Sequence, residues 1–187
     1  VNRRVDDDIK DNKPAFDQER TERRFWGIHY SQPLLTQKDN GEIFLFALDE
    51  EDSQNFATKD REIYTFGVRL WRKPIKQQFD YQLETVYQLG KSRTSNTATK
   101  TLDHWAHFHH AELGYSFDAP WLPRLIAQFD YASGDDDPND GQNNRFDTLY
   151  GARRFDFGPT SIYGAFARSN LLTPALRLNF KPIKTVK

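Results

Sequence analysis

The loop at residues 133–147 is the part of the sequence richest in groups that could bind a metal ion. Its carboxylates at Asp135, Asp137 and Asp140 are hard oxygen ligands of the kind that Ca²⁺ takes in sets of about six to eight. The spacing departs from an EF-hand, because Phe146 occupies the place of the closing Glu. The alternative is a solvated turn rich in Asp, Asn and Pro. A Ca²⁺ ion bound by this loop is the one cofactor that the sequence suggests.

Four histidines cluster at His104, His107, His109 and His110, and zinc could use two or three of them. On a strand, His107 and His109 share one face, and His104 and His110 share the other. Neither a carboxylate nor a third histidine accompanies the pair on its face. The sequence therefore favours polar residues at a strand end or a membrane interface over a metal site.

Catalysis finds no support in the sequence. There is no G-x-S-x-G motif, and the lack of Cys excludes thiol catalysis, Cys-ligated zinc and a disulfide scaffold. Asp80 and Glu84 share a strand face, but they lie roughly 13 Å apart at ~3.3 Å per residue. Acid pairs of glycosidases are separated by ~5–9.5 Å. We therefore expect a protein that is not an enzyme.

The sequence instead alternates between apolar and polar residues, and charged side chains recur at the polar positions, which are every second residue (the polar parity). A closed barrel would turn them into one lumen, where they would set ion selectivity and contact a solute. The mixture of signs argues against a purely anion-selective pore. In a soluble barrel or sandwich, the same face would simply meet water. The predicted pore lining consists of Arg69, Asp80, Glu84, Glu112, Arg124, Asp130, Arg154 and Arg177.

Strands must position these residues, and the alternation is clearest at Gln78–Leu89. A period of two fits a strand with one apolar and one polar face, and it does not fit a helix. The preceding segment, Arg61–Arg72, alternates in the same way, so the two segments predict a hairpin. The run at 42–48 is continuously apolar, which leaves its faces ambiguous. Further strands are predicted at 22–31, 104–117, 124–132, 147–157, 161–167 and 175–181, with no convincing helix.

The composition agrees with a β-protein. Only 37% of the residues are hydrophobic, yet 15 are Phe, 8 are Tyr and 4 are Trp. Aromatic residues suit half-buried strands and the interfacial girdles of membrane barrels. A net charge of −1 argues against a nucleic-acid partner. No run of 18 apolar residues predicts a transmembrane helix, and the absence of Met even at position 1 suggests a processed or excised piece.

Strand and loop lengths favour a membrane barrel over a soluble sandwich. Several predicted strands reach the ~9–11 residues that cross a bilayer at a tilt, beyond the ~5–6 typical of soluble sheets. The connections at 73–76 and 118–123 are short, whereas 49–60, 90–103 and 133–146 are long and polar. Outer-membrane barrels have this asymmetry. We expect a charged loop or disordered entry at 1–21, barrel strands over 22–181 and a tail at 182–187.

The stretch FDYASGDDDPNDG at Phe129–Gly141, followed by FDTLYG at Phe146–Gly151, resembles the alginate-export family of bacterial outer-membrane β-barrel porins. Over about 124–181 the likeness rests on these motifs. Over 22–117 it rests only on the general pattern of strands. It implies an all-β, antiparallel, up-and-down transmembrane β-barrel of about 18 strands in the bacterial outer membrane. It also implies passive passage of an anionic polysaccharide or a smaller solute. Arginines such as Arg69, Arg154 and Arg177 would favour uronate carboxylates.

At 187 residues the chain is expected to cover the C-terminal half of such a barrel, or to form a smaller barrel of 8 or so strands. An open half-barrel would leave two unpaired edges in lipid, and the oligomeric state is not predicted. A Ca²⁺-dependent adhesin is one alternative. Another is a soluble β-barrel that binds a hydrophobic or sugar ligand inside, with Tyr64, Phe66, Phe79, Tyr81 and Leu83 pointing inward.

Overall fold

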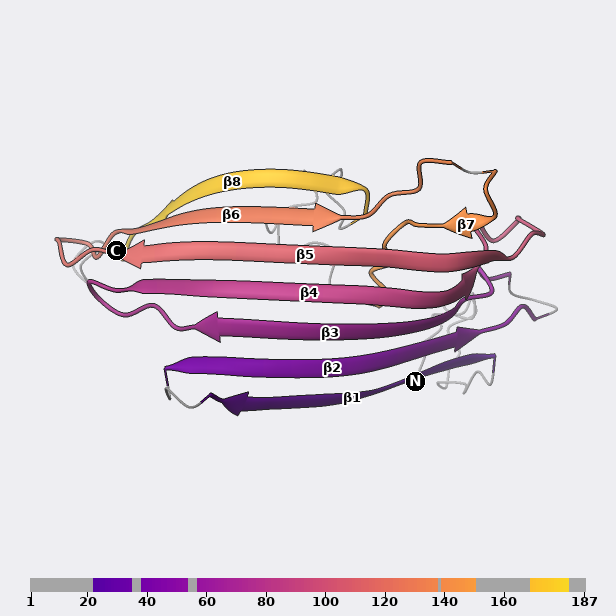
Figure 1. Ribbon diagram of the computed structural model, residues 1–187, viewed down its shortest axis with the longest axis horizontal. Helices are drawn as coiled ribbons and strands as arrows, with labels where there is room; N and C mark the ends of the chain where they lie inside the picture. Colours follow the sequence, from indigo (N-terminus) through magenta and orange to yellow (C-terminus); the bar gives the residue numbers. More distant parts are fainter. Residues whose placement is uncertain (1–21, 35–37, 54–56, 138, 151–168, 182–187) are drawn as a thin grey trace, which may run out of the picture.

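The computed structural model describes residues 22–34, 38–53, 57–137, 139–150 and 169–181, and within them it is a single antiparallel sheet (Figure 1). Its strands follow one another in space as they do along the chain, except that β7 pairs in parallel with β5. The first and last strands in this order, β1 and β8, are not paired with each other. The bounds are β1 Arg23–Pro33, β2 Asp39–Glu50, β3 Glu62–Arg72, β4 Phe79–Ser92, β5 Leu102–Ser116, β6 Arg124–Ala132, β7 Gln142–Asn143 and β8 Leu171–Asn179.

This arrangement confirms the predicted all-β, up-and-down architecture, and the sheet is an open part of a barrel. The connections also differ in length at the two ends of the sheet. Residues 34–38, 73–78 and 117–123 join strands at one end, and the longer 51–61, 93–101 and 133–170 join them at the other (Figure 1). No helix among the described residues is long and apolar enough to cross a membrane.

One predicted strand is wrong in the part that can be compared. The weak alternation at 147–157 predicted a strand, but residues 147–150 form an irregular segment that ends in a turn. Leu149 has a φ of 50°, which a strand does not allow. The rest of that prediction and the predicted strand 161–167 lie outside the described residues. The last strand begins earlier than predicted, at Leu171.

The sheet has an apolar face, built from the residues that the alternation placed on the apolar parity. Trp26 and Ile28 of β1, Tyr64 and Phe66 of β3 and Leu176 of β8 all lie on it, with 46–78% of each side chain exposed. The pairing carries this face across every long strand, as in the row Ile28–Leu45–Phe66–Tyr87–His107. Aromatic and aliphatic side chains therefore predominate on one side of the sheet, with His107 and His109 among them.

The opposite side, the polar face, changes character along the strands. At the end with the long connections it carries a buried cluster of Val86, Ala106, Phe108, Ala132 and Phe146. Phe44 also packs there, and its ring lies over Gly67 on the neighbouring strand, where a Cβ would overlap it. This packing explains the continuously apolar run at 42–48, because β2 meets apolar neighbours on both faces. Toward the short connections, the polar face becomes charged.

Candidate functional site

A segment between β6 and β8 folds back over the polar face, and we call residues 142–150 the strap. It begins beside β5, where Gln142 pairs with Asp103. It ends at Tyr150, whose ring meets Phe25 of β1 edge-on at 5.6 Å between centroids. The strap therefore crosses the strands from β5 to β1 on the polar face of the sheet.

Gln88 of β4 holds the middle of the strap by its backbone. The N–H of Asp147 donates to Gln88 Oε1 at 2.8 Å, and Gln88 Nε2 donates to the carbonyl oxygen of Asp147 at 2.8 Å. Gln88 Nε2 also donates to Thr65 Oγ1 at 3.1 Å. The Gln88 side chain is fully buried, so these bonds satisfy groups that water cannot reach.

Arg61, which precedes β3, holds the same strap residue by its side chain. Its Nη1 donates to both carboxylate oxygens of Asp147, at 3.0 and 2.9 Å, while Nε and Nη2 donate to Glu50. Burial raises the pKa of Asp147, but the charge and hydrogen bonds of Arg61, the Leu149 N–H and the charge of Lys59 outweigh it and leave that pKa below its usual range. The carboxylate is thus charged and paired at neutral pH.

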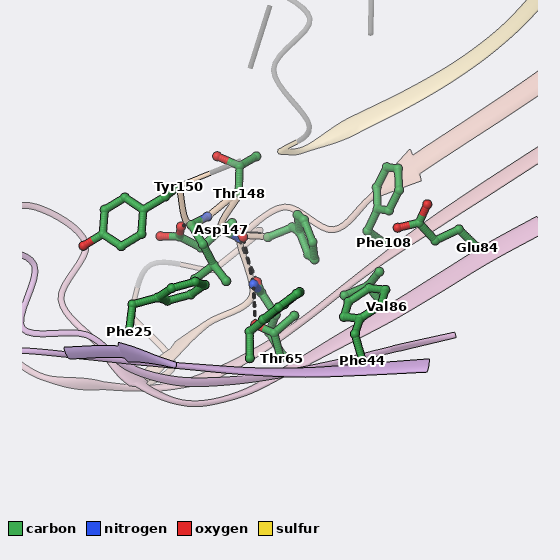
Figure 2. Close-up of a pocket in the computed structure, with 13 residues that line it drawn as sticks. Phe25, Phe44, Thr65, Glu84, Val86, Phe108, Asp147, Thr148 and Tyr150 are labelled. Atoms are coloured by element: carbon green, nitrogen blue, oxygen red, sulfur yellow. Dashed lines mark hydrogen bonds between the residues drawn. The ribbon is translucent and has the colours of Figure 1, made fainter. Parts of the chain in front are cut away.

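An apolar pocket of about 370 Å³ remains between the strap and the sheet (Figure 2). Figure 2 shows Tyr150, Thr148 and Asp147 of the strap on one side, with Phe25 and Thr65 of the strands facing them. Phe44, Phe46, Phe108 and Phe146 complete much of the lining. The hydroxyl of Thr65 and the amide of Gln88 are hydrogen-bonded to each other, and the Gln88 amide is also bonded to the strap.

The predicted lining residues within the described chain share the polar face, as the parity indicated. Arg124 Nε donates to Asp80 Oδ2 at 3.0 Å, and Arg124 Nη2 donates to Glu112 Oε1 at 2.7 Å. Arg177 of β8 also donates to Glu112. The guanidinium and carboxylate groups therefore neutralise one another along β4, β5, β6 and β8.

The remaining lining residues lie in different surroundings. Arg69 Nη2 donates to Gln82 at 2.8 Å, and its guanidinium lies over the Trp71 ring. Asp130 contacts His110 Nδ1 at 2.7 Å. Glu84 lines the apolar pocket beneath the strap, and Arg154 lies outside the described residues. Whether this face lines a pore stays a prediction.

The acidic loop uses two of its predicted Ca²⁺ ligands in local turns. Asp137 Oδ1 accepts from the Asn139 N–H at 3.0 Å, and Asp140 Oδ1 accepts from the Gln142 N–H at 2.8 Å. Across the residues that the structure describes, no group of three or more His, Cys, Asp or Glu side chains is placed to hold a metal ion. Calcium binding at Asp135, Asp137 and Asp140 stays a prediction.

The histidines divide between the two faces as their parity predicted. His107 and His109 lie on the apolar face, with His107 Nδ1 3.1 Å from His109 Nε2 and both rings close to Tyr131. His104 is buried on the polar face, where its Nδ1 lies 3.1 Å from Ser92 Oγ. The outward pair sits among Tyr87, Trp105 and Tyr131, an aromatic setting like that of interfacial girdles.

Comparison with known families decides the identity of the chain. A family model described as alginate export matches residues 9–187. The chain belongs to the alginate export family. Alginate export proteins are transport channels of the outer membrane, not enzymes, and this family assignment supports the same class and location for the present chain. No curated protein and no solved structure gives a significant match to it.

Sequence reasoning missed the strap and its two anchors, Gln88 and Arg61. Gln88 appeared only as one more polar residue of the alternation, because nothing in its neighbours distinguishes an amide that meets water from one that meets backbone. A usable signal did exist in the apolar residues Phe44, Phe46 and Phe108, which lie on the polar parity near one end of the sheet. Apolar side chains on both parities indicate that something covers the second face.

Proposed function

We propose that the polar face lines the channel of an outer-membrane barrel through which an anionic polysaccharide, or a related small solute, passes passively. The observation that carries the proposal is the opposition of the two faces. One face presents exposed aromatic and aliphatic side chains on every long strand, and the other presents ion pairs and the strap. A barrel in lipid requires this division, with apolar residues outward and polar residues inward.

Charges of both signs on the polar face suit a polyanion in transit. Arg124 and Arg177 are available to carboxylates, but each also contacts Glu112. A lining of unpaired arginines would bind uronates tightly, and conduction requires that a solute leave as readily as it enters. The paired lining supports weak, successive contacts with the sugar chain.

The alternative of a soluble barrel with a ligand inside requires the apolar face to point inward. In the structure, Tyr64, Phe66, Phe79 and Leu83 are 46–59% exposed. The buried cluster and the strap lie on the opposite face. The described arrangement therefore favours the channel.

The test begins with the protein secreted to the outer membrane of a bacterial host. A band that requires detergent for extraction and shifts its gel mobility on boiling is expected for a folded membrane barrel. Purified protein in a planar bilayer should then conduct, and uronate oligomers should reduce the ionic current more than uncharged oligosaccharides of the same length. A soluble monomer without a heat-dependent shift, or equal block by charged and uncharged sugars, would overturn the proposal.

A further inference from the structure

A second cavity, of about 630 Å³, lies at the end of the sheet with the long connections. Phe146, Asp147 and Thr148 line both this cavity and the apolar pocket, so the strap separates the two. The second cavity differs in chemistry, because charged and hydroxyl side chains supply most of its lining. We call it the mouth cavity. Its charged residues are Lys59, Arg61, Arg93, Arg145, Asp135 and Asp147.

The mouth cavity holds more positive than negative groups, and two of its cations are unpaired. Arg61 binds Glu50 and Asp147, and Arg93 binds Asp52 at 2.6 Å. Lys59 and Arg145 have no carboxylate within 4.0 Å in the part of the chain that the structure describes. Neither side chain is therefore held in an ion pair, although the charge of Lys59 also acts on Asp147, which Arg61 already binds. Both cations can thus contact an incoming anion, which favours an anion over a cation at this place.

Three buried polar atoms of the same cavity lack hydrogen-bond partners. They are Nε of Arg93, Oδ1 of Asp135 and Oγ of Ser169, and all three residues line the cavity. Nε of Arg93 lies 3.8 Å from Asp60, beyond hydrogen-bond distance. Buried polar atoms are normally paired, so three unpaired atoms around one cavity indicate a missing polar partner. Two of them can donate, and two can accept.

We propose that the mouth cavity is a binding subsite for one uronate residue of the transported polysaccharide, an inference that rests on the proposed function. The carboxylate of the sugar binds between Lys59 and Arg145, which provide charge-assisted hydrogen bonds. The hydroxyls of the sugar bind the amide of Asn143, the hydroxyl of Ser169 and the carboxylate of Asp135. A Ca²⁺ ion could bind Asp135, but the positive charges of Lys59 and Arg145 would repel it. A neutral sugar would have no negative group for Lys59 and Arg145 to bind.

The direct test is calorimetric titration of the detergent-solubilised, heat-modifiable protein with a uronate trisaccharide. Lys59→Gln and Arg145→Gln should each weaken binding about tenfold, the usual effect of losing a hydrogen bond to a charged group. The matched control is Lys100→Gln, which removes one exposed positive charge from the 93–101 connection outside the cavity lining. The control should bind as the parent protein does. The same trisaccharide with its carboxylates reduced to alcohols should not bind measurably.

The conservative pair Lys59→Arg and Arg145→Lys should retain most of the affinity, because it keeps both charges. Unchanged binding in Lys59→Gln and Arg145→Gln, beside uronate-sensitive conductance in the parent protein, would overturn the subsite while leaving the channel in place. Loss of uronate-sensitive conductance in the parent protein would overturn the proposed function itself. Titration with Ca²⁺ alone tests a cation site. Saturable Ca²⁺ binding that Asp135→Asn abolishes would overturn the uronate subsite and make the cavity a cation site.

Discussion

The side-chain amide of Gln88 meets both backbone hydrogen-bonding groups of Asp147, with two bonds of 2.8 Å. A neighbouring β-strand would offer a residue the same donor and acceptor pair, so the Gln88 side chain takes the place of a strand partner for Asp147, which lies outside the short β7 pairing. The strap is therefore held at its backbone by β4 as well as at the Asp147 side chain by Arg61, and a substitution on β4 should be enough to release it.

We expect Gln88→Leu to release the strap. The change leaves the N–H and carbonyl of Asp147 without partners in a buried place, at a cost of about 1–3 kcal/mol. Trypsin should then cleave the folded protein after Arg145 about tenfold faster than it cleaves the parent protein. Gln82→Leu is the control, because Gln82 lies on the same face of the same strand but bonds Arg69 instead of the strap. Equal cleavage of both variants would show that Gln88 does not hold the strap.

The strap should stay in place at mildly acidic pH and should be released only at low pH. The pKa of Asp147 lies below its usual range, so its pairing with Arg61 stabilises the docked strap at neutral pH and is lost as the pH falls through that lowered pKa. Cleavage by pepsin, an acid protease, should therefore rise only below the ordinary carboxylate range, about pH 4. In Asp147→Asn, cleavage should be higher at pH 5 and should change less on further acidification. A steep rise at pH 5–6 in the parent protein would contradict this assignment.

Neighbouring residues of β8 should respond oppositely to an introduced charge. Leu176 is 78% exposed on the apolar face, whereas Ala175 lies on the polar face beside Gln128. Leu176→Arg should destabilise the folded barrel by about 2–4 kcal/mol if it faces the middle of a bilayer. Ala175→Arg should be tolerated. The fraction of heat-modifiable protein in isolated outer membranes measures both, and an equal loss in the two variants would argue against a lipid-facing surface.

Substitutions at Gly67 and Phe44 should have non-additive effects on the free energy of unfolding. The Phe44 ring occupies the space where a Cβ on Gly67 would stand, so Gly67→Ala must push that ring off the sheet. We expect a loss of about 1–3 kcal/mol, as for other overpacked sites. Phe44→Leu should cost free energy on its own, but the double variant should cost less than the sum of the two. Additive losses in urea unfolding would show that the two residues are independent.

The alternation at 61–72 and 78–89 predicted β3 and β4 closely, because each strand has one face that meets apolar surroundings and period two is unambiguous there. The position of Arg69, Asp80 and Arg124 on a common face followed from the same parity. The ion pair between Arg124 and Asp80 did not follow, since Arg124 of β6 reaches Asp80 of β4 over Gly114 of β5, and such a contact depends on the register of three strands.

The strap could not be predicted for a related reason. Tyr150, Phe155 and Phe157 form a weak alternation of apolar residues over 147–157, so the end of the strap looked like the start of another strand. Its actual path depends on contacts with Arg61 and Gln88, far away along the chain. A local sequence pattern does not indicate contacts with residues so far away along the chain.

The long separation between the strap and its anchors also sets an order of assembly. Asp147 lies 86 residues from Arg61 and 59 residues from Gln88 along the chain. The anchoring groups come from separate places, around β3 and β4, so they converge only after those strands have paired. We therefore expect a folding intermediate in which the sheet is formed and the strap is still free. In the proposed channel, the strap would then narrow the bore in the last step, after the sheet that holds it has formed.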